Sequence, residues 1–221
     1  MSFSLTIQLQ LSQAIMKTLI PPTASTLFLF SLFLLLSIFT SNLHSAAADA
    51  VTDRDGDALR NGGTYHILPL FGVRDGGVEL AATGNETCPL TIVQSSTSQI
   101  FRGLPVRISS PYRMAYITEG LTLNLAFASS PSCAPTPPNW TVVKDLPEGQ
   151  SVKLPGFRST VSGWFKIEKS SLEYLYKVVF CARTGGTCGD VGISVDDEGM
   201  SRLVVTEEED EGIIVEFMKA G

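Results

Sequence analysis

Apolar and polar residues alternate in short runs along most of the chain. In Leu121–Phe127 the alternation is strict, so Leu121, Leu123, Leu125 and Phe127 are expected to face one core. Eleven further short runs have strand character: Thr64–Leu68, Val78–Ala82, Leu90–Gln94, Val106–Ile108, Ala115–Ile117, Thr141–Val143, Phe165–Glu168, Tyr176–Phe180, Gly192–Val195, Leu203–Thr206 and Ile213–Phe217. Twelve short strands separated by glycine-containing turns predict an all-β domain, closed or nearly closed into an antiparallel barrel, because open sheet edges invite aggregation.

A different apolar run lies near the N-terminus. Leu27–Phe39 is thirteen residues long and is broken only by two serines. That is too short to span a bilayer and is typical of the core of a secretory signal peptide. Lys17 precedes the run, and Ala46–Ala48 supplies small residues for cleavage, which we expect near Ala48 or Ala50. We therefore expect residues 1–48 to be a leader, with Met16 as an alternative start. Residues 49–221 would be one mature domain, secreted or vacuolar, with no membrane contact after cleavage.

The charge distribution changes once the leader is set aside. Lys17 is the only charged residue before residue 49, so the other 173 residues carry 15 Lys+Arg and 22 Asp+Glu, a formal net charge of −7. An acidic domain of this size is large enough for one core. An acidic chain is a poor candidate for binding a phosphate backbone, which requires a basic face, so we expect no nucleic-acid partner.

Four cysteines follow the leader, which predicts two disulfides in a secreted chain. Three pairings are open. We favour the sequence neighbours, Cys88–Cys133 and Cys181–Cys188, because the second pair flanks a segment that resembles a hairpin turn. A zinc site is disfavoured, since there is no CxxC pair and His66 is the only histidine after the leader. We predict no metal and no cofactor.

Enzymatic signatures are absent from the sequence. His66 lies in a strand-like run, and no G-x-S-x-G, phosphate-binding loop or dinucleotide fingerprint occurs. The chain is therefore not expected to be an enzyme. Asn85-Glu-Thr87 and Asn139-Trp-Thr141 are sequons, which makes Asn85 and Asn139 candidate glycosylation sites in a secretory chain.

The first part of the mature chain carries a recognisable pattern, Val51-x-Asp53-x-x-Gly56-x-x-Leu59-x5-Tyr65-x-Ile67. It resembles the N-terminal signature of the plant Kunitz inhibitors, the soybean trypsin inhibitor family. Three further blocks and the cysteine order are similar to that family: Ser109–Gly120, Asp145–Gly149 and Cys188–Val205. The resemblance extends from Val51 to about Phe217. It implies a β-trefoil in which six strands close a barrel and six form hairpins that cap it.

The resemblance also implies an inhibitory loop. By position, Arg113 in Ser110-Pro111-Tyr112-Arg113-Met114 enters the specificity pocket of a serine protease, and Arg113–Met114 is the reactive bond. Met114 stands where the closest relatives usually carry a β-branched residue. In the family, the asparagine that corresponds to Asn61 reaches across to hydrogen-bond the backbone of this loop, whereas the residues alone favour a plain turn at Asn61-Gly62-Gly63.

Physical chemistry supports Arg113 as the residue that binds the pocket. The pocket of trypsin holds a buried carboxylate, which selects a long cation able to make bidentate contacts. Pro111 restricts its own φ and biases Ser110 towards an extended backbone, which is the shape a protease cleft binds. Arg102 and Arg107 lack such a setting.

These features predict a monomeric, substrate-mimicking inhibitor whose partner is a trypsin-like serine protease. Two alternatives stay open: inhibition of subtilisin, a cysteine protease or α-amylase, and a non-inhibitory storage or stress protein. A carbohydrate-binding trefoil is disfavoured, because its Gln-x-Trp repeat is absent.

Overall fold

The computed structural model describes residues 48–70, 76–95, 102–147, 149–172, 174–185, 188–206 and 212–221, so the leader predicted for residues 1–48 lies outside it except for Ala48. Thirteen strands occur there: β1 (Gly63–Pro69), β2 (Val78–Ala81), β3 (Thr91–Gln94), β4 (Val106–Ser109), β5 (Asn124–Phe127), β6 (Thr141–Leu146), β7 (Gly149–Lys153), β8 (Thr160–Val161), β9 (Gly163–Lys169), β10 (Tyr176–Ala182), β11 (Cys188–Val195), β12 (Ser201–Thr206) and β13 (Ile214–Lys219). Within these ranges no helix is long and apolar enough to cross a membrane.

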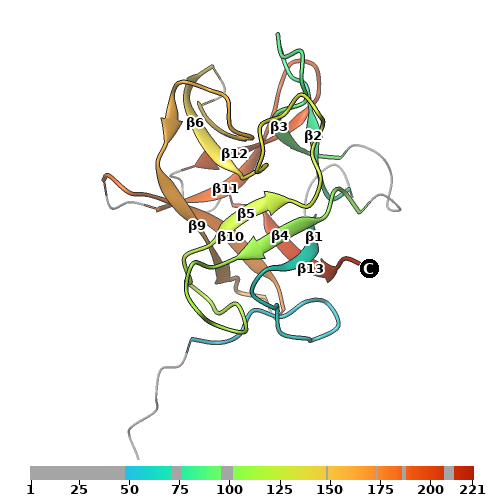
Figure 1. The fold of residues 1–221 in the computed structure, drawn as a ribbon, viewed down its shortest axis with the longest axis vertical. Coiled ribbons are helices and arrows are strands. Elements are labelled where there is room, and N and C mark those ends of the chain that lie inside the picture. The colour runs from blue at the N-terminus through green and yellow to red at the C-terminus, as the bar shows by residue number, and fades with distance from the viewer. Residues whose placement is uncertain are drawn as a thin grey trace, which may run out of the picture. The chain divides into compact units, whose positions relative to one another are not determined.

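Six of the strands close a barrel (Figure 1). β1 pairs with β4 and β13, β13 with β10, β10 with β9, and β4 with β5, all antiparallel. The ring closes where Leu123, just before β5, bridges Phe165 of β9 through N–H···O distances of 2.8 and 3.2 Å. Leu123, Leu125 and Phe127 are buried as the alternation predicts, and Leu121 packs half-buried against the core. The barrel therefore has no free edge along this ring.

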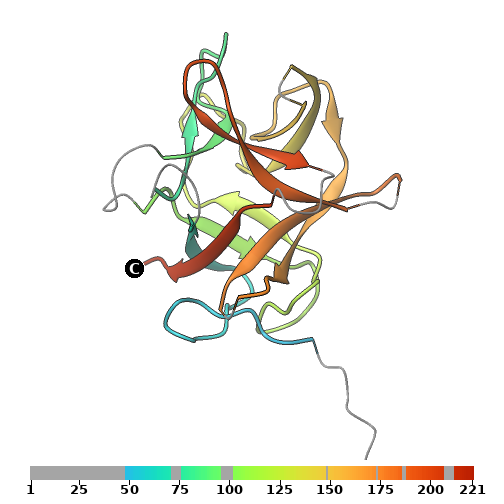
Figure 2. The ribbon, with the colours of Figure 1, turned by 180° about the vertical axis from the view of Figure 1, so that it is seen from behind.

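Six of the other seven strands form three hairpins that cap one end of the barrel, and the short β8 pairs with β6. β2 pairs with β3, β6 with β7, and β11 with β12. The hairpins meet through β3, β7 and β12, each of which pairs with the other two. Six barrel strands and three capping hairpins make a β-trefoil, which confirms the predicted fold. The hairpins gather at the upper end in Figures 1 and 2, and the β4–β5 connection lies at the lower end.

Two disulfides stabilise this arrangement, and both have the favoured pairing. Cys88 bonds to Cys133 across 45 residues, so the β2–β3 region is linked to the connection after β5. Cys181 bonds to Cys188 across seven residues and joins β10 to β11. No free cysteine is left.

One predicted strand is wrong. Ala115–Ile117 forms no continuous ladder, and Tyr116 makes only an isolated bridge with Arg60. The run is nevertheless fixed, because Ile117 N donates to Leu59 O at 2.8 Å. The segment is therefore a loop held by backbone hydrogen bonds rather than part of the sheet.

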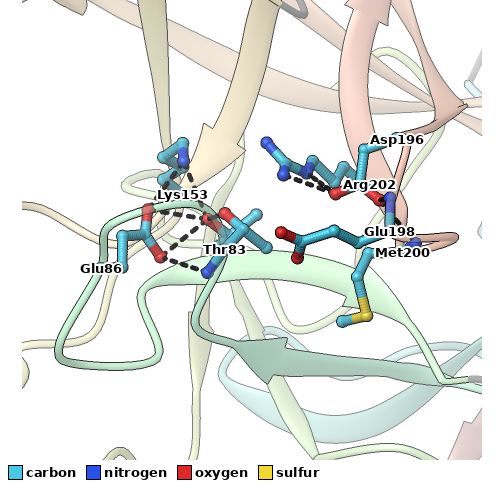
Figure 3. Close-up of polar contacts among 8 residues, drawn as sticks. Thr83, Glu86, Lys153, Asp196, Glu198, Met200 and Arg202 are labelled. Carbon is cyan, nitrogen blue, oxygen red and sulfur yellow. Dashed lines mark hydrogen bonds and ion pairs between the residues drawn. The ribbon is translucent and has the colours of Figure 1, made fainter.

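Two strands were not predicted, β7 and the two-residue β8. β7 contains Ser151 and Lys153, both of which are buried. Because lysine is usually exposed, a buried lysine breaks the alternation of apolar and polar residues by which a strand is predicted from sequence. The Lys153 ammonium lies 2.8 Å from Glu86 Oε1 and donates to Thr91 Oγ1 at 2.8 Å. Figure 3 shows Glu86 turned towards Lys153, with Thr83 beside it. A paired charge is tolerated in the interior, and here it joins two capping hairpins.

A second polar cluster fixes the tip of the β11–β12 hairpin (Figure 3). Asp196 Oδ1 accepts from the N–H groups of Met200 at 2.8 Å and Glu198 at 3.0 Å, and Asp196 Oδ2 pairs with Arg202. Burial raises the pKa of Asp196, but these hydrogen bonds and the Arg202 charge outweigh it, so that pKa lies below its ordinary value. The carboxylate is therefore charged near neutral pH and closes its own turn.

Candidate functional site

The connection between β4 and β5 presents a row of exposed side chains. Tyr112 is 57% exposed, Met114 40% and Tyr116 47%, and Arg113 is also exposed. Elsewhere in the described ranges the domain exposes only four large hydrophobic side chains, Leu70, Leu172, Tyr174 and Val195. Apolar groups gathered on one loop around a cation are a typical partner-binding feature.

The side chain of Asn61 braces this loop from the inside. Its Oδ1 accepts from Ser110 N at 2.8 Å. Its Nδ2 lies 3.1 Å from both Tyr112 O and Met114 O, with a longer 3.4 Å contact to Ser110 O. One amide thus connects the carbonyl before Arg113 with the carbonyl after it. The contact that the family resemblance implies for Asn61 is present in this geometry.

The backbone around Asn61 is itself held in place. Gly62 has φ +79°, which a residue with a side chain adopts only with strain, so the Asn-Gly turn suits this position. Gly62 N donates to Ile108 O of β4 at 2.8 Å, and Asn61 N donates to Ala115 O at 3.0 Å. The brace is therefore anchored to the strand that enters the loop and to the segment that leaves it.

Arg113 sits at the apex of a tight turn. Met114 N donates to Tyr112 O at 2.9 Å, and Tyr112 N donates to Ser110 Oγ at 3.3 Å. Within the part of the chain that the structure describes, no hydrogen bond or ion pair engages the Arg113 guanidinium. The loop is thus ordered by its backbone while its cation stays available. Pro111, beside Ser110, is also exposed.

The sequence pattern missed Tyr116 as a surface residue. The run Ala115–Ile117 resembles a short strand in the sequence, yet it forms a loop in which Tyr116 is 47% exposed and bridges Arg60. Two other arginines are also exposed: Arg102 precedes β4, and Arg107 lies within it. Both lie outside the loop segment Ser110–Met114 that Asn61 contacts. The local signal that points to Tyr116 is the alternation itself, because a buried Ile117 places its neighbour Tyr116 on the opposite face.

Metal ligands do not gather anywhere in the described ranges, where no group of three or more His, Cys, Asp or Glu could hold an ion. Asp53, Asp55 and Asp57 lie close together in the sequence, but the Asp53 carboxylate binds backbone groups of its own turn. Its Oδ1 accepts from Asp55 N at 3.1 Å and from Asp57 N at 3.0 Å. His66 lies in β1, opposite Met218 of β13.

The two sequons lie on different connections between strands. Asn85 is exposed on the turn between β2 and β3, and Asn139 is exposed where it bridges Ala126 of β5. Both side chains are accessible, as glycan attachment requires, and glycosylation at these positions stays a prediction.

Comparison with known proteins gives the chain a family context. Residues 51–219 match the legume Kunitz family model, described as trypsin and protease inhibitor. Trypsin inhibitor A of Glycine max is 44% identical over 199 residues, covering 86% of this chain and 90% of that protein. Trypsin inhibitor 1A of Psophocarpus tetragonolobus is 45% identical over 162 residues, covering 72% and 92% respectively.

Solved structures agree with the sequence relatives. Soybean trypsin inhibitor in complex with porcine pancreatic trypsin superposes with a TM-score of 0.71 at 43% identity, covering 78% of this chain and all of the inhibitor. A Kunitz-type trypsin inhibitor from Cicer arietinum has the same TM-score at 32% identity, covering 78% of this chain and 99% of its own. The matched family model, the sequence identity and the shared fold lead to one conclusion: this chain belongs to the legume Kunitz family of trypsin and protease inhibitors.

Proposed function

We propose that the protein is a secreted inhibitor of trypsin-like serine proteases and that Arg113–Met114 is its reactive bond. The observation that carries this proposal is the pairing of an exposed, unengaged Arg113 with a loop backbone braced by Asn61 on both sides of that bond. The similar soybean inhibitor has been solved in complex with porcine pancreatic trypsin, which supports the same class of target.

The mechanism follows from the geometry of the loop. The guanidinium enters a pocket whose floor is a carboxylate, and the protease serine reaches the Arg113 carbonyl. Because Asn61 Nδ2 donates to Tyr112 O and Met114 O, the two sides of the bond are held together even while it is attacked. The leaving amine of Met114 stays close, so religation competes with hydrolysis. A loop already ordered before docking also loses little entropy on binding.

Stoichiometric titration tests this proposal directly. We expect the protein that comprises residues 49–221 to abolish trypsin activity at one inhibitor per protease. Chymotrypsin, subtilisin and papain, titrated in parallel, should keep most of their activity, because their binding sites do not select a long cation. Residual activity against inhibitor concentration gives both the stoichiometry and the dissociation constant.

The same titration separates the alternatives. Loss of subtilisin or papain activity without loss of trypsin activity would assign the protein to another target class. No loss with any of the four enzymes would contradict inhibition and favour a storage or stress role. A mock titration with the heat-denatured, reduced protein controls for non-specific adsorption.

We also propose that the leader is cleaved after Ala48. Asp49 O accepts from Glu119 N at 2.9 Å, and Ala50 bridges Thr118, next to the inhibitory loop. Cleavage after Ala50 would remove the Asp49 contact and leave Val51 N, which donates to Ile117 O at 3.0 Å, as the remaining link at this end. N-terminal sequencing of the protein purified from its native tissue should begin at Asp49, and an N-terminus upstream of residue 40 would contradict secretory processing.

A further inference from the structure

Met114 is a thioether in an unusual position. It is 40% exposed and follows Arg113 directly, on the leaving-group side of the proposed reactive bond. Peroxides convert the methionine thioether to a sulfoxide when they can reach the sulfur atom. An exposed methionine at this position therefore brings oxidant-sensitive chemistry into the surface that must contact the protease.

The other methionines of the domain are placed differently. Met218 of β13 is 8% exposed, and its sulfur lies 3.6 Å from Arg54 Nη1. Met200 is half-buried at the tip of the β11–β12 hairpin, where its N–H is held by Asp196 (Figure 3). That tip lies at the capped end of the barrel, away from the β4–β5 loop (Figure 1). Met114 is thus the most exposed of the three and the one on the binding loop.

We propose that Met114 is a site of reversible oxidation by hydrogen peroxide and that its sulfoxide weakens the complex with the protease. This inference rests on the proposed function. In the reaction a lone pair of Sδ attacks one peroxide oxygen, the O–O bond breaks and an S–O bond forms. The sulfide loses two electrons, and the peroxide is reduced to water. A methionine sulfoxide reductase restores the sulfide: two thiols are oxidised to a disulfide, and the sulfoxide oxygen leaves as water.

The effect on binding follows from what docking buries. Contact at Arg113 brings the next side chain against the protease, where a flexible apolar thioether adapts to the surface. A sulfoxide oxygen is a strong acceptor, and it loses its water on docking without a donor prepared for it. The loop itself should not change, because Asn61 holds the backbone carbonyl of Met114 and not its side chain. We expect the dissociation constant to rise by about tenfold or more.

The test uses the domain of residues 49–221 and bovine or porcine trypsin. The dissociation constant is measured before peroxide treatment, after it, and after incubation with methionine sulfoxide reductases. Peptide mass mapping at each stage assigns the added oxygen to Met114, Met200 or Met218. Met114→Leu is the matched variant, because it keeps an apolar side chain of similar volume that peroxide does not attack, and Met200→Leu is the control.

The outcomes separate this inference from the proposed function. We expect Met114 to be oxidised first, affinity to fall in the wild type and in Met200→Leu, and the reductases to restore it. Met114→Leu should bind equally well before and after peroxide. A protein with Met114 fully oxidised and an unchanged dissociation constant overturns the inference, as does oxidation of Met200 ahead of Met114. Failure of the untreated protein to bind trypsin overturns the proposed function and this inference with it.

Discussion

Arg113→Ala is expected to raise the dissociation constant for trypsin by about a thousandfold or more, equivalent to about 4 kcal/mol. The guanidinium is the group that would pair with the carboxylate in the protease pocket. Truncating it leaves that carboxylate buried without a partner, which costs more than the loss of an exposed contact. The measurement is the inhibition constant from tight-binding titration of residual trypsin activity.

The fold should tolerate this change. Arg113 is exposed, and no hydrogen bond or ion pair in the described ranges engages its guanidinium, so the free energy of unfolding in urea should change by less than about 0.5 kcal/mol. Arg107→Ala is the matched control, because Arg107 is an exposed cation on β4, outside the loop segment Ser110–Met114 that Asn61 contacts. Its removal should alter trypsin affinity by no more than a fewfold, as for other charges away from the centre of an interface.

A replacement of the side chain distinguishes loss of recognition from loss of loop structure. Arg113→Phe should lose trypsin inhibition and gain inhibition of chymotrypsin, whose pocket is an apolar slot. The Asn61 contacts involve only backbone atoms of the loop, so they survive this substitution. If Arg113→Ala still titrated trypsin at one to one, the reactive bond would have to lie elsewhere on the domain.

The barrel could be predicted from the sequence because its strands bury one face. Alternation reveals such strands, as in Leu121–Phe127, where Leu123, Leu125 and Phe127 are buried in the structure. The cap was harder to predict. β7 places Lys153 in the interior, and only the folded chain brings Glu86 to within 2.8 Å of it. The residues of β7 alone do not show that the charge of Lys153 is paired, because its partner Glu86 comes from a different hairpin.

The loop shows the same limit. An arginine beside Pro111 indicates an exposed, restrained cation, and the structure has both exposed. The brace is different, since Asn61 and Ser110 are 49 residues apart. Local residues favoured a simple turn at Asn61, and the cross-loop contact came only from the family resemblance. Long-range hydrogen bonds from one side chain to several backbone atoms have no periodic pattern in a single sequence.

Asn61→Ala is expected to turn the inhibitor into a slow substrate. It removes the side-chain amide that hydrogen-bonds the backbone of Ser110, Tyr112 and Met114. The residues on either side of Arg113 then lose the hydrogen bonds that connect them to Asn61. The loop then relaxes when the bond is attacked, the Met114 amine moves away, and water completes hydrolysis. We expect cleavage at Arg113–Met114 to accelerate about a hundredfold, equivalent to about 2.7 kcal/mol, which is the net worth of two or three hydrogen bonds.

The measurement is the rate at which catalytic trypsin cleaves the inhibitor, followed by mass spectrometry, together with the return of trypsin activity. Asn124→Ala is the matched control, because Asn124 is an exposed asparagine at the start of β5, across the sheet from Ser109. It should leave the cleavage rate unchanged. An Asn61→Ala protein that stays as intact as the wild type would show that the backbone alone holds the loop.

Asn61→Asp separates the two halves of the brace. A carboxylate still accepts from Ser110 N, but it has no N–H to donate and places negative charge beside the carbonyl oxygens of Tyr112 and Met114. If donation across the bond prevents hydrolysis, the aspartate variant should be cleaved at least as fast as Asn61→Ala. If the single contact to Ser110 N is sufficient, the aspartate variant should resist cleavage like the wild type. The backbone bond from Asn61 N to Ala115 O is kept in both variants, so any difference between them reports on the side chain alone.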